Sequence, residues 1–119
     1  MIRIHTTGLV VAALLAASPL LAEAPQVNLQ IKTRAFEPAQ VHVPAGIKIR
    51  LVIHNADSAP AEFESYDLSR EVVVPGGGDS VVYIGPLDAG SYKFFNDFYP
   101  ASTGTVIAAP ASTLSPPHD

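Results

Sequence analysis

Cysteine and tryptophan are absent from this chain of 119 residues, and methionine occurs once. The lack of cysteine excludes disulfide bonds, zinc–thiolate sites, a cysteine nucleophile and copper held by a thiolate. Basic residues are scarce as well, with seven lysines and arginines against eleven aspartates and glutamates and a formal net charge of −4. An acidic chain without a basic patch is not expected to bind nucleic acid or anionic lipid.

Only one long apolar run occurs, from Gly8 to Leu21, and it follows Arg3. A positive charge, an apolar run of about fourteen residues and then small residues are typical of an export signal, and the run is short for a membrane span. We predict a signal peptide at residues 1–22, cleaved after Ala22, so that the mature protein is not inserted in the membrane. A retained N-terminal anchor is the alternative.

The rest of the chain predicts one all-β domain at residues 23–108, followed by a disordered tail at residues 109–119 that is rich in proline and serine. Apolar and polar residues alternate, as in half-buried strands, and runs such as Pro75 to Gly78 mark turns. No helix is expected beyond a turn near Ser65 to Ser69. Seven to eight short strands separated by turns predict a Greek-key β-sandwich. The clearest predicted strands are 27–31, 41–43, 47–53, 71–74, 80–84, 92–96 and 105–108.

Two glutamates, Glu62 and Glu64, stand two positions apart in an extended segment. Residues at this spacing lie on one side of a strand, about 6.6 Å apart along the chain, so Phe63 is expected to pack on the other side. Two carboxylates on one side repel each other unless a cation or a base lies between them. The alternative interpretation is a solvated strand edge, where charge protects against aggregation.

The remaining polar residues give weaker indications of a functional site. Asp97 follows an aromatic strand and precedes Tyr99, but an Asp at the start of a loop commonly bonds to the backbone. His42 and His54 fall in predicted strands, with no second histidine at a spacing typical of metal ligands. No nucleophile motif surrounds any serine. An enzyme acting on an organic substrate therefore has no support.

Six landmarks lie along the chain: Phe36-Glu-Pro38, Val43-Pro-Ala-Gly46, Asn55-Ala-Asp57, Gly85-Pro-Leu87, Gly90-Ser-Tyr92 and Gly104. Through these landmarks the chain resembles, from about Val27 to Ala108, the cupredoxin-like domain family. In that family the last loop reads Cys-x-x-His-Pro-x-Met-x-Gly and carries three copper ligands. The corresponding positions here are Asn96, Tyr99 and Ser102, and the fourth ligand position falls on or near Glu62. The resemblance therefore implies a retained sandwich that has lost its type 1 copper site.

Within that family, the chain is similar to the periplasmic cupredoxin-like components of bacterial ferrous-iron uptake systems. This resemblance implies a periplasmic location, with a periplasmic iron-binding protein and an iron permease as partners. The segments that carry it are Glu62-Phe-Glu-Ser65, Glu71, Val74-Pro-Gly76, Ile84-Gly-Pro-Leu87 and Phe95-Asn-Asp-Phe98.

The resemblance also implies a metal site, because the two ligand loops of the family meet at one end of the fold. Glu62, Glu64 and Asp97 would then be direct ligands. Tyr99, Asn96 and Glu71 would be further ligands or would support them. Oxygen ligands suit hard cations such as iron, Mn²⁺ and Ca²⁺, and Cu²⁺ would also bind them.

We therefore expect a periplasmic accessory protein that binds iron, or copper, and hands it on. Ferroxidase activity ranks below binding and delivery, since a carboxylate site without cysteine or methionine offers no evident electron route. One alternative is a metal-free interaction module that docks a partner through Phe94, Phe95, Phe98 and Tyr99. Another is a non-blue copper site that uses Glu62, His42 or His54.

Overall fold

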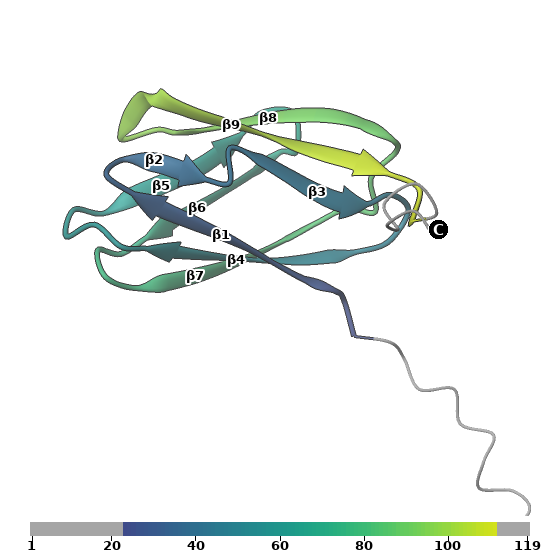
Figure 1. Ribbon diagram of the computed structural model, residues 1–119, viewed down its shortest axis with the longest axis horizontal. Coiled ribbons are helices and arrows are strands. Elements are labelled where there is room, and N and C mark those ends of the chain that lie inside the picture. Colours follow the sequence, from purple (N-terminus) through teal and green to yellow (C-terminus); the bar gives the residue numbers. More distant parts are fainter. Residues whose placement is uncertain (1–22, 112–119) are drawn as a thin grey trace, which may run out of the picture.

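Two β-sheets packed face to face form the fold in the computed structural model, which describes residues 23–111 (Figure 1). The predicted signal peptide and residues 112–119 of the predicted tail lie outside the described residues. No helix within residues 23–111 has the length and apolar character needed to cross a membrane. The strands are β1 (Gln26–Lys32), β2 (Ala35–Glu37), β3 (Gln40–Pro44), β4 (Ile49–Asn55), β5 (Ala61–Ser65), β6 (Arg70–Val74), β7 (Asp79–Ile84), β8 (Gly90–Asn96) and β9 (Tyr99–Ala109).

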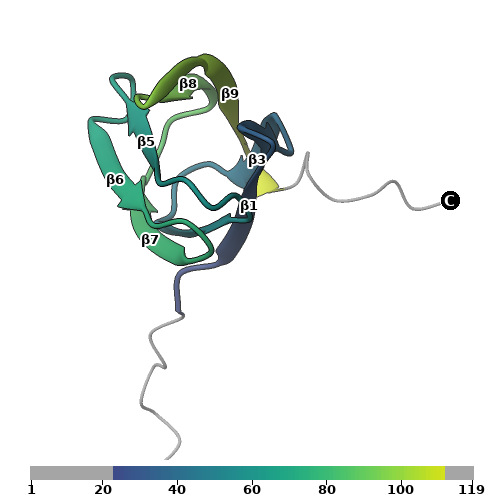
Figure 2. The same cartoon turned by 90° about the vertical axis from the view of Figure 1, so that its left-hand side faces the viewer.

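The nine strands divide into a four-stranded sheet, in the order β2-β1-β4-β7, and a five-stranded sheet, in the order β3-β9-β8-β5-β6. Figure 2 shows the two layers from one end of the sandwich. The pairs β1–β4 and β3–β9 are parallel, and the remaining neighbours are antiparallel. The predicted all-β sandwich is confirmed.

The core lies between the sheets and is built from the alternation that the sequence displays. In β4, Leu51 and Ile53 are fully buried, while Val52 and His54 lie on the outer side. Three phenylalanines from different strands, Phe36, Phe63 and Phe94, fill one region of this core. The Phe94 ring centroid lies 4.9 Å from that of Phe36 and 5.0 Å from that of Phe63. Burial of each such side chain stabilises the fold by about 1.5–3 kcal/mol.

The final strand is longer than the sequence predicts. It begins at Tyr99 and not at Thr105, so the expected ligand loop is instead the start of β9. Asn96 pairs with Tyr99, which leaves only Asp97 and Phe98 in the turn between β8 and β9. Pairing with β8 provides hydrogen-bond partners for backbone groups that an open loop would have to satisfy in another way. The prediction of a loop up to Gly104 was therefore wrong.

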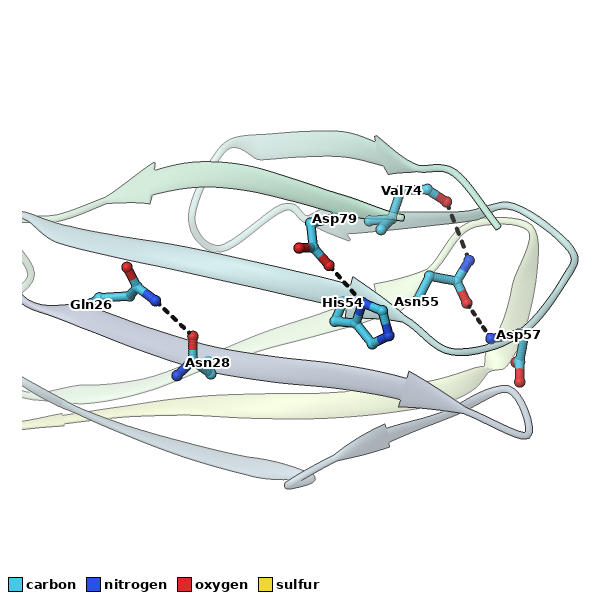
Figure 3. A network of polar contacts seen from close by, with 7 residues as sticks. All are labelled: Gln26, Asn28, His54, Asn55, Asp57, Val74 and Asp79. Carbon is cyan, nitrogen blue, oxygen red and sulfur yellow. Dashed lines mark hydrogen bonds and ion pairs between the residues drawn. The ribbon is translucent and has the colours of Figure 1, made fainter. Parts of the chain in front are cut away.

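Two neighbouring turns are held by polar side chains at the same end of the sandwich. Thr33 and Arg34 both have positive φ angles, of 52° and 65°, as in the tight turns that join hairpin strands. Their backbone N–H groups each donate to the Asp57 carboxylate at 2.8 Å. The buried Asn55 side chain accepts from the Asp57 N–H at 3.0 Å and donates to the Val74 carbonyl at 3.3 Å (Figure 3). The Asn55-Ala-Asp57 landmark is thus part of the fold's own framework.

Gly104 on β9 provides a test of this packing. A methyl group added at this position would lie 2.2 Å from the Phe94 ring and 3.0 Å from the Ala39 carbonyl oxygen. We expect Gly104→Ala to lower the free energy of unfolding by about 1–3 kcal/mol, because the core would be overpacked. Urea denaturation measures this change. The matched control is Thr103→Ala, at an exposed position of the same strand, which should change stability by less than about 0.5 kcal/mol.

Candidate metal site

Glu62 and Glu64 lie on the outer face of the five-stranded sheet. Residues alternate strictly along β5: Ala61, Phe63 and Ser65 are buried, while the two glutamates between them are half-buried. Phe63 is fully buried in the core. The prediction that the glutamates share one side and Phe63 packs on the other is therefore confirmed.

Asn96 joins the beginning of β5 to the turn between β8 and β9. Its side-chain Oδ1 accepts from the backbone N–H of Glu62 and from that of Phe98, both at 3.0 Å. The Asp97 N–H donates to the Glu62 carbonyl at 2.9 Å. We call these three hydrogen bonds the Asn96 link. Because they fix both backbone polar groups of Glu62, they hold Asp97 beside β5.

Three carboxylates converge as a result. One oxygen from each of Glu62, Glu64 and Asp97 lies within 4.8 Å of the other two, which is close enough to surround a single cation. Asp97 is exposed, so this acidic cluster opens to solvent. Glu71 of β6 lies directly opposite Glu64 in the sheet and is also exposed.

The electrostatics of the acidic cluster are unfavourable in the absence of a cation. The pKa of Glu64 is raised above its ordinary value, first by desolvation of its half-buried side chain and then by the charges of Asp97, Glu71 and Glu62. When it is protonated, Glu64 can also donate a hydrogen bond to the Glu62 carboxylate, which raises the Glu64 pKa in the same direction. A bound cation would relieve this repulsion, and three carboxylate oxygens form a donor set that suits a hard divalent ion.

The structure places the remaining predicted ligands in different surroundings. Asn96 is 4% exposed, and its Oδ1 already accepts two of the three hydrogen bonds of the Asn96 link. The ring of Tyr99 lies against the Arg34 guanidinium, whose central carbon is 4.6 Å from the ring centroid. Ser102 donates from its hydroxyl to the Arg34 carbonyl. Direct metal contact by Tyr99, Asn96 or Glu71 stays a prediction.

Both strand histidines lie apart from the acidic cluster. His42 is exposed on β3, and His54 lies on the outer face of the other sheet, with Nδ1 2.6 Å from an oxygen of Asp79. The group of converging ligand residues among the described residues contains neither. This geometry argues against a copper site formed by Glu62 together with His42 or His54.

The aromatic residues near the acidic cluster divide between the core and the surface. Phe94 is 1% exposed and belongs to the core, whereas Phe98 is 51% exposed. Phe95 lies opposite Glu64 on the outer face, and its ring centroid is 5.3 Å from that of Tyr66. In the sequence, Tyr66 gives no signal of function beyond being an aromatic residue in a predicted turn.

A family model described as a cupredoxin-like domain matches residues 6–108. The chain therefore belongs to the cupredoxin-like domain family. It has no cysteine, so it holds no type 1 copper site. An uncharacterized protein of Rickettsia prowazekii (strain Madrid E) is 45% identical over 74 residues, which are 62% of this chain. The match spans 59% of that relative's length.

Solved structures of copper proteins share the fold. The Cu(I)-bound metal-binding domain of the Cu(I)-exporting P-type ATPase CopA from Streptococcus pneumoniae D39 aligns with a TM-score of 0.64 and 15% identity, over 71% of this chain and 84% of that one. Auracyanin A from Chloroflexus aurantiacus aligns with a TM-score of 0.61 and 14% identity, over 73% of this chain and 100% of that one. Amicyanin from Paracoccus versutus aligns with a TM-score of 0.55 and 20% identity, over 79% of this chain and 87% of that one. At these identities the likeness establishes the fold alone.

The Asn96 link can be tested through stability. In Asn96→Ala the backbone N–H groups of Glu62 and Phe98 lose their shared acceptor in a largely buried region. We expect the free energy of unfolding to fall by about 1–3 kcal/mol. The control is Asn28→Ala, because the Asn28 side chain is bonded only at an exposed position, to Gln26. Equal stability of the two variants in urea would contradict the structural role of Asn96.

The raised pKa of Glu64 predicts a pH dependence of stability. The folded protein holds this proton more tightly than the unfolded chain, so ionisation of Glu64 lowers stability as pH rises from the ordinary glutamate pKa through the raised value. Glu64→Gln should therefore melt at a higher temperature than the parent near neutral pH, and the difference should shrink in acid. Thermal denaturation between about pH 3 and pH 8 tests this, with Asp88→Asn as an exposed control. A Glu64→Gln variant that melts below the parent at neutral pH would refute the prediction.

Proposed function

We propose that this protein is a periplasmic accessory component of a bacterial iron-uptake system that binds a metal ion at the acidic cluster and hands it to a partner. The observation that carries the proposal is the convergence of Glu62, Glu64 and Asp97 on one outer face of a cupredoxin-like sandwich. The fold is one in which related structures hold metal, as in the Cu(I)-bound domain of CopA. What differs here is the donor set, which consists of carboxylates alone.

The donor set favours iron over copper as the physiological ion. Hard carboxylate oxygens match Fe²⁺ and Fe³⁺, whereas Cu(I) prefers thiolate and thioether ligands. Cu²⁺ would still bind in vitro, because it forms the most stable complexes of the first-row divalent ions. Binding and delivery, not oxidation, are the proposed activities.

Delivery requires that the ion can leave, and the exposure of the acidic cluster supports this. Asp97 is open to solvent and Glu62 and Glu64 are only half-buried, so a partner's ligands could approach the ion directly. The proposed partners are a periplasmic iron-binding protein and a membrane permease. Export to the periplasm is proposed from the apolar N-terminal sequence.

A metal-free interaction module is the second candidate, and two exposed rings favour it. Tyr66 is 75% exposed and Phe98 is 51% exposed, and aromatic side chains are frequent anchors of protein interfaces. Under this alternative the acidic cluster would serve only as a solvated surface, and its removal would leave any metal affinity unchanged.

Calorimetric titration of metal-stripped protein with Mn²⁺, anaerobic Fe²⁺ and Cu²⁺ tests the proposal. The parent should bind about one Mn²⁺ or Fe²⁺ ion, and Glu62→Gln/Asp97→Asn should lose at least about tenfold in affinity for these ions while it stays folded. Affinity should also fall as pH is lowered, because protons compete for the carboxylates.

The matched control is Glu23→Gln/Asp88→Asn, which removes the same charge at two exposed positions elsewhere. This variant should bind as the parent does. Equal losses in the two double variants would mean that binding reflects net charge and not a site. No binding by the folded parent would favour the interaction module.

A further inference from the structure

A row of four polar residues crosses the outer face of the four-stranded sheet, on the sheet that does not carry the acidic cluster. Glu37 of β2 pairs with Gln30 of β1, Gln30 pairs with His54 of β4, and His54 pairs with Asp79 of β7. Neighbouring strands lie about 4.8 Å apart, so directly opposite residues bring their side chains close together. All four residues line a single open hollow of about 520 Å³, with Asn28 at its side.

Asp79, at one end of this row, holds the His54 ring in a defined orientation. Its Nδ1 lies 2.6 Å from the Asp79 carboxylate, and the other ring nitrogen points away from Asp79 (Figure 3). A carboxylate at Nδ1 holds the proton on that nitrogen, which leaves the lone pair on Nε2 when the ring is neutral. Metal-binding histidines show this arrangement, in which one ring nitrogen donates to a carboxylate and the other binds the metal.

The residues on the other side of His54 can complete a ligand set. Gln30 offers a side-chain carbonyl oxygen and Glu37 a carboxylate, and both line the hollow together with His54. The side chain of His54 is 50% exposed, so an ion can reach it from solvent. One imidazole nitrogen with amide and carboxylate oxygens suits borderline cations such as Zn²⁺ and Cu²⁺, in contrast to the all-carboxylate acidic cluster.

The geometry points to a second metal site on this chain, at which His54 Nε2, Gln30 and Glu37 bind a borderline divalent cation and Asp79 positions the imidazole. This histidine site is independent of the proposed function, since it shares no residue or sheet with the acidic cluster. Asp79 is a positioning residue and does not touch the ion.

Nitrogen-15 NMR of the imidazole ring during a Zn²⁺ titration tests the inference. The protein used carries His5→Gln, His42→Gln and His118→Gln, so that His54 is the sole remaining histidine. It also carries Glu62→Gln, Glu64→Gln and Asp97→Asn, which remove the acidic cluster. We expect Zn²⁺ to shift the Nε2 resonance and to leave the proton on Nδ1. Asp79→Ala in this background should weaken the apparent affinity by about tenfold to a hundredfold.

A further variant separates a built site from a lone surface histidine. Gln30→Ala/Glu37→Ala keeps the His54–Asp79 pair and removes the oxygen ligands, so it should also weaken Zn²⁺ binding by at least about tenfold. An unchanged affinity in this variant would overturn the inference, as would Zn²⁺ on Nδ1 or an imidazole that does not respond to millimolar Zn²⁺. Unfolding curves of each variant confirm that the sandwich is intact before the titration is interpreted.

Discussion

The Asn96 link is the interaction on which the arrangement of the acidic cluster depends. A single side-chain oxygen accepts backbone hydrogen bonds from the start of β5 and from the turn that follows β8. These segments are far apart in sequence, and the Asp97 N–H adds a third bond to the Glu62 carbonyl. The backbone is therefore fixed before any ion is bound. A preorganised donor set lowers the entropy that binding must overcome.

Electrostatic repulsion within the acidic cluster opposes this fixed geometry. Glu64 lies among Asp97, Glu71 and Glu62, and its pKa is raised accordingly. The fold thus maintains an arrangement that is unfavourable when all the carboxylates are ionised. Such local conflicts are common at functional sites, where the surrounding structure maintains what the site alone would not adopt. Under the proposed function, the cation restores the balance, and an acidic environment or a competing ligand promotes its release.

The acidic cluster brings together the carboxylates that the family resemblance implied, but most of the positions matched to the type 1 ligands have other roles. Three of the four positions matched to the type 1 ligands lie outside the acidic cluster. Instead Asn96 holds backbone groups, and Tyr99 and Ser102 contact Arg34. Only Glu62 of that set joins the acidic cluster, and it does so on the outer face of a sheet. The chain retains the family's sandwich and gathers its carboxylates between β5 and the turn that joins β8 to β9.

The sequence was most informative where hydrophobic alternation is uninterrupted. It predicted β1 and β4 within a few residues and placed Glu62 and Glu64 on one side, because a period of two follows from strand geometry. It missed β2, which has only three residues, and it placed the start of β9 six residues too late. Those boundaries depend on pairing with distant strands. The approach of Asp97 to Glu62, 35 positions earlier, rests on a backbone-bonded asparagine and came only from the family resemblance.

The most direct test of the central claim is anomalous X-ray diffraction from crystals soaked in Mn²⁺, recorded near the manganese absorption edge. The account predicts an anomalous peak within coordination distance, about 2.0–2.6 Å, of carboxylate oxygens from Glu62, Glu64 and Asp97. The Asn96 link should be unchanged from the metal-free protein. Carboxylates of the acidic cluster that remain without an ion at saturating Mn²⁺ would contradict the proposal that this acidic cluster is a metal site.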